Sequence, residues 1–245
     1  MTPELTHTAF ETTRREPRMS VTVDRVRRLG GIVGIAFVVL GVIAIFLPGT
    51  PPKADEVSKI AGYFTDKRGS ILASNYLTCL AFALFLLFVG ALRSYFGGAD
   101  PTGVRPGSTM LAGAVLAVST IFAGTAVLNG AVFQVASAGD ANLNHALYDI
   151  ANDLFLATGF GFAVMFVDAA ASVRITAALP SAMAPTALAV ALLNLVSGVG
   201  FFANSGFFAI GGTFTFIPPL ASLIWILVAS IIMIRRAPIG RSLAA

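Results

Sequence analysis

Charged side chains are scarce in this 245-residue chain. They make up 11% of the residues, whereas an ordinary soluble domain has about 25%. Hydrophobic residues make up 56%, and a chain this apolar has too few polar groups to cover its surface in water. The composition therefore excludes an ordinary soluble domain and predicts an integral membrane protein that lies in the lipid bilayer.

Cysteine and histidine are nearly absent. The one cysteine, Cys79, excludes an intrachain disulfide and a cysteine-based zinc site. The two histidines, His7 and His145, lie far apart in the chain, and zinc needs three or four ligands. The chain also lacks a nucleotide-binding loop, a nucleophile elbow and a dinucleotide fingerprint. These absences disfavour an enzyme, and we predict no cofactor, no resident metal and no nucleic-acid partner.

Six long apolar runs occupy most of the chain. Each is long enough to cross a hydrocarbon core of about 30 Å as a helix that rises about 1.5 Å per residue. The runs cover residues 29–47, 71–92, 109–134, 150–173, 183–203 and 216–234. The predicted fold class is therefore all-α, an integral membrane bundle of six transmembrane helices.

The connection between the first two runs, residues 49–70, has a different pattern. Its apolar residues recur at Val57, Ile60, Ala61 and Phe64, which is the i, i+3, i+4, i+7 spacing of one helix face. We expect a short external amphipathic helix here, which either lies on the membrane surface or caps the bundle.

Lysine and arginine are distributed unevenly between the two sides of the predicted bundle. The side that holds both termini carries twelve of the sixteen, and the other side carries four that acids nearly balance. Because positive residues concentrate in cytoplasmic segments, we predict a plasma-membrane protein with both termini in the cytoplasm. The chain then divides into a flexible cytoplasmic tail (1–28), a six-helix transmembrane domain (29–236) and a short cytoplasmic tail (237–245). Met19 is an alternative translation start.

Acids without basic neighbours mark the fourth run. No lysine or arginine occurs between Arg105 and Arg174, yet this interval holds four aspartates. At about 100° per residue, five polar residues near the start of the run share one helix face, and we call them the polar stripe: Asn142, His145, Asp149, Asn152 and Asp153.

Three interpretations of the polar stripe stay open. In the first, it marks a capped helix that enters the membrane at its surface, where polar residues cost little. In the second, it binds a cation, a proton or a polar ligand reached from outside. In the third, His145 and Asp149, one helical turn apart, share a metal ion with Asp153 one turn deeper.

Asp168 is predicted to belong to the opposite membrane face. It lies fifteen residues beyond Asp153, about 22 Å farther along a helix. There we expect it to pair with Arg93 or Arg174, or to cap a neighbouring helix.

At mid-membrane depth the runs hold neutral polar residues such as Thr158, Asn194 and Ser197. Such residues usually form hydrogen bonds from helix to helix. An acid is lacking at this depth, and no internal repeat is apparent, so an ion-driven transporter of familiar design is disfavoured.

Two segments carry a resemblance to a known kind of protein. Residues 66–96, DKRGSILASNYLTCLAFALFLLFVGALRSYF, resemble a pattern in uncharacterised multi-pass membrane proteins of actinobacteria. In those proteins a short external helix ends in a basic residue before a Leu/Phe-rich span that closes in Leu-Arg. Residues 173–190, VRITAALPSAMAPTALAV, resemble their cytoplasmic turn, although the Trp-Leu-Gly run frequent there is absent. The resemblance covers the second to the fifth spans, and it implies a fold class and no activity.

Small residues suggest how the helices pack and what the protein does. They form two seams suited to close helix contacts, in the first run at Gly30 and Gly34 and in the third at Gly113, Ala117, Thr120 and Gly124. We therefore expect a non-enzymatic membrane protein that acts through helix–helix contacts with itself or with a membrane partner. One alternative is an outward-facing binder or transporter of a small molecule or cation that uses the polar stripe, and another is a membrane metallo-hydrolase.

Overall fold

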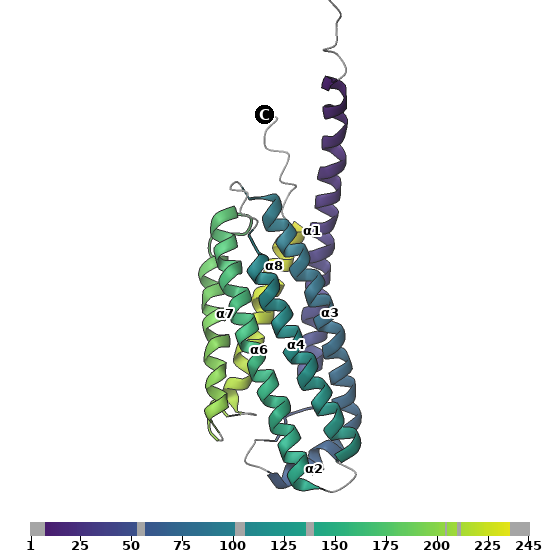
Figure 1. Cartoon of the computed structure of the whole chain (residues 1–245), viewed down its shortest axis with the longest axis vertical. Coiled ribbons are helices and arrows are strands. Elements are labelled where there is room, and N and C mark those ends of the chain that lie inside the picture. The colour runs from purple at the N-terminus through teal and green to yellow at the C-terminus, as the bar shows by residue number, and fades with distance from the viewer. Residues whose placement is uncertain are drawn as a thin grey trace, which may run out of the picture.

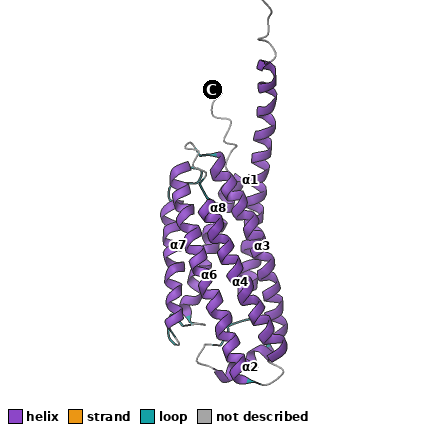
Figure 2. Cartoon of the chain, viewed as in Figure 1, coloured by secondary structure: helices purple, strands orange, loops and turns teal. Residues whose placement is uncertain are grey.

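The computed structural model describes residues 8–52, 57–100, 106–135, 140–203, 205–209 and 212–235. Within these residues it contains helices and the turns and loops that join them, and no strand (Figure 2). Six of the helices are long and apolar enough to cross a membrane. The predicted fold class, a six-helix membrane bundle with a short extra helix between the first and second spans, is confirmed.

The helices follow one another along the chain with short connections. The six spans are α1 (Thr8–Phe46), α3 (Arg68–Gly98), α4 (Ser108–Gly130), α6 (Ala141–Thr176), α7 (Met183–Ser197) and α8 (Ile217–Arg235). The short helix α2 (Val57–Asp66) connects α1 to α3. A π-helix, η1 (Ala131–Val135), follows α4, and the 3-10 helices η2 (Gly198–Phe202) and η3 (Thr213–Phe216) follow α7 and precede α8.

The first helix is longer than its predicted span. The run at residues 29–47 predicts the membrane-crossing part, which the structure places at Arg25–Phe46. However, α1 begins at Thr8, so most of the segment predicted as a tail continues the helix of the first span. The division of the chain into two tails and one transmembrane domain stays a prediction.

The six spans form a closed ring. Successive spans run in opposite directions, so the start of α1 and the end of α8 lie at one end of the bundle and α2 lies at the other (Figure 1). We call these the terminal end and the α2 end. Each span packs on the next one along the chain, and α8 packs back on α1. The centre of this ring must therefore be lined by inward-facing side chains.

Glycine brings the two most extensively packed helices, α4 and α6, together. A Cβ added at Gly113 would lie 2.6 Å from the backbone nitrogen of Met165, and one added at Gly161 would lie 2.6 Å from the backbone nitrogen of Ala117. In α1, a Cβ at Gly34 would meet the ring of Phe88 at 2.6 Å. The seams predicted in the first and third spans are confirmed as packing seams, and these contacts are made within the chain.

Large apolar side chains fill the ring toward the terminal end. The fully buried ones include Leu92, Phe96, Met110, Met165 and Phe166. Trp225 of α8 packs edge-on against Phe166, with ring centroids 5.3 Å apart. The Trp225 indole N–H also donates to the carbonyl oxygen of Met183 at 3.2 Å, which ties α8 to α7.

Asp168 caps a neighbouring helix. Its Oδ2 accepts a hydrogen bond from the backbone N–H of Met110, with 2.6 Å between the two atoms, in the first turn of α4. The residue before α4 is Gly107, which has a φ of 90° and no side chain to accept such a bond. A carboxylate from α6 therefore satisfies one of the free N–H groups at this helix start. Of the roles predicted for Asp168, the structure shows the cap.

The amphipathic helix α2 caps the other end of the bundle. Ile60 and Phe64, two residues of its predicted apolar face, are fully buried and pack in one cluster with Val132 and Tyr148. The Tyr148 hydroxyl donates to the carbonyl oxygen of Pro52 at 2.6 Å, which fastens the connection before α2 to α6. Two placements are predicted for this helix, on the membrane surface or as a cap on the bundle. The structure shows the cap, because α2 covers the end of the ring.

Candidate functional site

The polar stripe begins next to a capped helix terminus. Asp140 precedes α6, and its Oδ1 accepts hydrogen bonds from the backbone N–H groups of Asn142 and Leu143 at 3.1 and 3.0 Å. A side-chain oxygen in this place satisfies N–H groups that have no partner within the helix. The structure therefore contains the capped helix start on which the first interpretation rests.

The structure places the five stripe residues in different surroundings. The side chains of Asn142 and Asp153 are exposed, and those of His145, Asp149 and Asn152 are half-buried. The buried face of this part of α6 is formed by other residues, Asn144, Tyr148 and Ala151. Apart from Asn152, the stripe therefore lies beside the inward face of α6 and does not form it.

His145 and Asp149 are the two stripe residues that contact each other. Nε2 of His145 lies 3.3 Å from Oδ2 of Asp149, one helical turn apart. A zinc ion needs at least one further protein ligand, and the described residues contain no group of three or more His, Cys, Asp or Glu side chains that could hold a metal ion. The described residues therefore do not contain the ligands that the third interpretation, a metal site at the stripe, requires.

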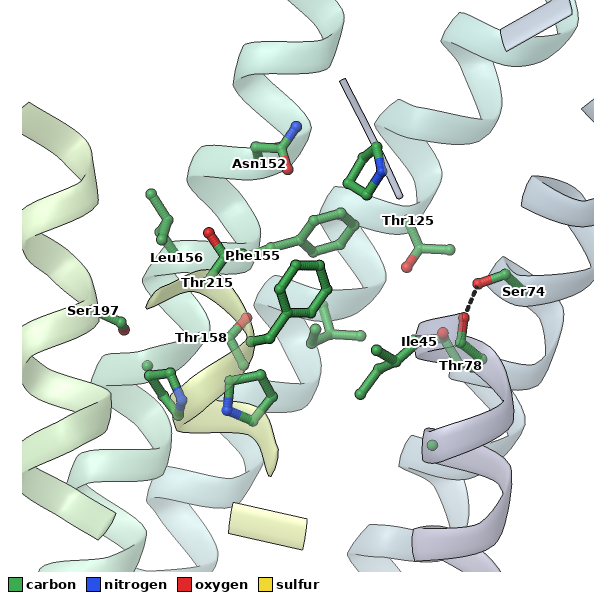
Figure 3. Close-up of a pocket in the computed structure, with 18 of the residues that line it drawn as sticks. Ile45, Ser74, Thr78, Thr125, Asn152, Phe155, Leu156, Thr158, Ser197 and Thr215 are labelled. Atoms are coloured by element: carbon green, nitrogen blue, oxygen red, sulfur yellow. Dashed lines mark hydrogen bonds between the residues drawn. The ribbon is translucent and has the colours of Figure 1, made fainter. Parts of the chain in front are cut away.

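Asn152 is the stripe residue that faces the inside of the bundle, where it lines a cavity of about 350 Å³. The cavity lies in the half of the ring near the α2 end, and all six spans contribute to its lining. Figure 3 shows labelled polar side chains from opposite walls around one common space. The volume is at the low end of the roughly 300–1,000 Å³ typical of small-molecule sites.

Four phenylalanine rings separate the cavity from the packed half of the ring. They belong to three different spans, and their centroids lie between 5.0 and 6.2 Å apart, which is the range for aromatic packing: Phe37, Phe82, Phe85 and Phe162. The fully buried core beyond these rings contributes no residue to the cavity lining. The cavity is therefore a pocket in one half of the bundle and does not extend through its whole length.

The described lining carries no charge. It contains no Asp, Glu, Lys, Arg or His side chain, and its polar groups are hydroxyls and side-chain amides. Burial raises the pKa of the Tyr63 phenol above its usual range, so this group stays protonated and neutral. An ion in this apolar surrounding would have no counter-charge among the described lining residues, and burying an unpaired charge is costly. The cavity therefore suits an uncharged molecule.

The Thr125 hydroxyl in the lining has no hydrogen-bond partner. Thr125 of α4 is 3% exposed, and its Oγ1 is a buried atom that no described group contacts through a hydrogen bond. Figure 3 shows this side chain at the edge of the shared space. Buried hydroxyls in folded proteins nearly always have a partner. Thr125 Oγ1 is therefore a buried polar atom in the cavity wall that no described group satisfies.

The polar residues at depth also join helices. Nδ2 of Asn194 donates to Oγ of Ser222 at 2.9 Å, which links α7 to α8, and the hydroxyls of Thr120 and Thr158 lie 2.9 Å apart between α4 and α6. The helix-to-helix hydrogen bonds predicted for Thr158 and Asn194 are confirmed. These residues also line the cavity, which the sequence does not predict, because each lies alone in its own apolar run and its position around the helix gives no sign of its partners.

No protein-family model, curated protein or solved structure matches this chain. The resemblance to actinobacterial multi-pass membrane proteins therefore stays a prediction, and the cavity is the feature of the molecule that bears on function.

Proposed function

We propose that this multi-pass membrane protein binds a small, uncharged, largely apolar molecule in the cavity at the α2 end, without converting it chemically. The observation that carries the proposal is the cavity of about 350 Å³, whose described lining is neutral and rich in phenylalanine and proline. An apolar pocket with a few polar groups is the usual form of a small-molecule site.

The cavity is a stronger basis for function than the glycine seams. The seams motivate the expectation of a protein that acts through helix–helix contacts with itself or a partner. However, Gly34, Gly113 and Gly161 make their close contacts with other spans of the same chain, so these residues leave no surface for a second molecule. Non-enzymatic action remains part of the proposal, and self-association stays a prediction.

The proposal includes an orientation in the plasma membrane. The charge distribution predicts that the terminal end, with its excess of arginine, lies in the cytoplasm. The α2 end and the cavity would then lie toward the outside, as the binder interpretation of the polar stripe also expects. Reporter fusions at residues 60, 142 and 210 test this orientation, and a cytoplasmic signal at any of them contradicts it.

Filling the cavity tests the binding proposal. Thr78 lines the cavity and makes no hydrogen bond through its side chain among the described residues, so Thr78→Phe occupies space without breaking a bond. The probe is a ten-carbon alkyl chain that carries a photoreactive diazirine and a terminal hydroxyl, used with purified protein in lipid nanodiscs. We expect light-induced labelling of peptides around the cavity, mapped by mass spectrometry, to fall at least tenfold in the variant.

The matched control for this variant is Thr186→Phe, which places the same ring at an exposed position of α7 outside the cavity. This variant should be labelled like the unaltered protein. If Thr78→Phe and Thr186→Phe are labelled equally around the cavity, the probe does not occupy it and the proposed function is wrong.

A further inference from the structure

The hydroxyl groups around the cavity have mostly used their protons within the protein. Each of five lining hydroxyls donates to a backbone carbonyl oxygen at 2.6–3.2 Å: Ser74, Thr158, Ser197, Thr215 and Ser222. A hydroxyl has one proton and two lone pairs. These groups therefore have acceptor capacity left for a ligand and no proton to donate to it.

The side-chain amides of the lining show the same bias. Nδ2 of Asn194 donates to the carbonyl oxygen of Val190 and to Oγ of Ser222, both at 2.9 Å, which uses both of its N–H groups. Nδ2 of Asn152 donates to the carbonyl oxygen of Tyr148 at 2.7 Å. A carbonyl oxygen can only accept, so these bonds fix which amide atom is the nitrogen.

The amide oxygens are consequently the atoms left without a donor. No described residue donates a hydrogen bond to Oδ1 of Asn152 or of Asn194, and both residues line the cavity. The groups that keep a proton to donate are fewer, namely the hydroxyls of Tyr63 and Thr78 and one N–H each of Asn75 and Asn152. The cavity as a whole therefore offers more acceptors than donors.

We infer that the bound molecule is an uncharged, hydroxyl-headed amphiphile, a membrane-soluble alcohol whose head donates hydrogen bonds to these amide oxygens; this inference rests on the proposed function. A cationic donor is disfavoured because the lining, as far as the structure describes it, holds no counter-charge. The phenylalanine rings at the base of the cavity, such as Phe82 and Phe162, give the alkyl chain an apolar surface. If each non-hydrogen atom takes the roughly 30 Å³ of a water molecule, the cavity holds about a dozen.

The size and chemistry of decan-1-ol match this description, and its methyl ether is the matched comparison. The ether keeps the chain and the acceptor oxygen and loses the donor. Both compounds compete against the diazirine-bearing alcohol probe in nanodiscs, at equal mole fraction in the bilayer so that differences in partitioning cancel. We expect the alcohol to displace the probe at a mole fraction about tenfold lower than the ether does, as loss of one well-placed hydrogen bond predicts.

The variant Asn152→Leu tests whether the Oδ1 atom of Asn152 causes the preference for the alcohol over the ether. The variant removes Oδ1 from the cavity, and we expect the tenfold preference for the alcohol to shrink to about twofold while displacement by the ether stays the same. The unfolding temperature of the variant checks that the bundle is intact. Thr78→Phe serves as the variant in which the cavity is filled.

The outcomes separate the inference from the proposed function. If the alcohol and the ether displace the probe equally and Thr78→Phe blocks labelling, the cavity binds neutral molecules but the donor inference is overturned. If the preference for the alcohol persists in Asn152→Leu and in a second variant, Asn194→Leu, the amide oxygens do not cause it and the inference is also overturned. If Thr78→Phe leaves labelling unchanged, the proposed function itself fails.

Discussion

The two halves of the helix ring differ in what their inward positions carry. Toward the terminal end, the side chains of Phe88, Leu92 and Phe96 of α3 point toward the centre of the helix ring, and all three are fully buried. Toward the α2 end, the same helix lines the cavity with Ser74, Asn75 and Thr78. α8 changes in the same way, from Met233 and Ile226 at one end to Ser222 at the other.

This difference shows that the cavity is not a consequence of the helix arrangement alone. One set of six spans encloses both halves, and large side chains fill one of them. In the other half some of the inward residues are smaller and polar, and their hydrogen bonds hold the helices in place around an open space. Interiors normally fill such spaces because every void loses packing contacts. A cavity retained in this way favours a binding role for the α2 half and a structural role for the terminal half.

The largest effect is expected from crowding the packed half. Gly161→Ala places a methyl group 2.6 Å from the backbone nitrogen of Ala117 and 2.8 Å from the carbonyl oxygen of Gly113, and neither atom can move without separating α4 from α6. We expect a loss of about 3 kcal/mol in the free energy of unfolding, since overpacking costs this much where relief is poor. Thermal unfolding in detergent measures it.

Gly90→Ala is the control for this substitution. A Cβ at Gly90 would have no atom within 4 Å, so the variant should be neutral or more stable by up to about 1 kcal/mol through helix propensity. Equal unfolding temperatures for Gly161→Ala and Gly90→Ala would show that the α4–α6 contact is not as close as described.

A smaller loss is expected from removing the cap on α4. Asp168→Ala leaves the Met110 N–H without its acceptor, and we expect a decrease of about 1.5 kcal/mol in stability, typical of a lost capping carboxylate with a favourable helix-end charge. Asp66→Ala, at an exposed position of α2, should change stability little. If Asp168→Ala and Asp66→Ala unfold at the same temperature, the hydrogen bond from Met110 to Asp168 does not stabilise the bundle.

Thr125→Val should raise stability and leave binding nearly unchanged. Replacing an unsatisfied buried hydroxyl with a methyl group of similar shape removes a desolvation cost, so we expect the ligand-free protein to gain about 1 kcal/mol. Oγ1 has almost no surface open to the cavity, so labelling by the diazirine probe should change by less than about twofold. Thr186→Val, at the exposed side of α7, should change neither. A Thr125→Val protein that loses stability would show that this hydroxyl has a partner.

The smallest effect is expected from the acids of the polar stripe. Asp149→Asn together with Asp153→Asn leaves the cavity lining unchanged, so labelling by the neutral probe should change by less than twofold. The interpretation in which the stripe itself is the binding site expects binding to be abolished instead. The double variant therefore decides whether the ligand meets Asn152 from the cavity or meets the other stripe residues from outside.

The membrane spans and the short helix α2 could be predicted because each depends on a pattern within one segment. The bilayer requires about twenty consecutive apolar residues per helix, and the spacing of Ile60 and Phe64 assigns α2 an apolar face. The cavity could not be predicted in this way. Thr125, Asn152 and Asn194 belong to three helices, and nothing in one helix records which residues of another lie opposite.

The sequence by itself determined that the chain is a six-helix membrane bundle, because hydrophobicity and helix length are properties of each segment and the hydrocarbon core selects for them directly. The tertiary structure decided which face of each helix turns inward. Gly113 and Gly161 fix the rotation of α6 against α4 through backbone contact, and this rotation buries Tyr148 and Ala151 while the polar stripe, apart from Asn152, stays beside the inward face. Side-chain contacts between helices set that rotation, so the cavity and its unpaired Thr125 hydroxyl exist in the assembled bundle alone.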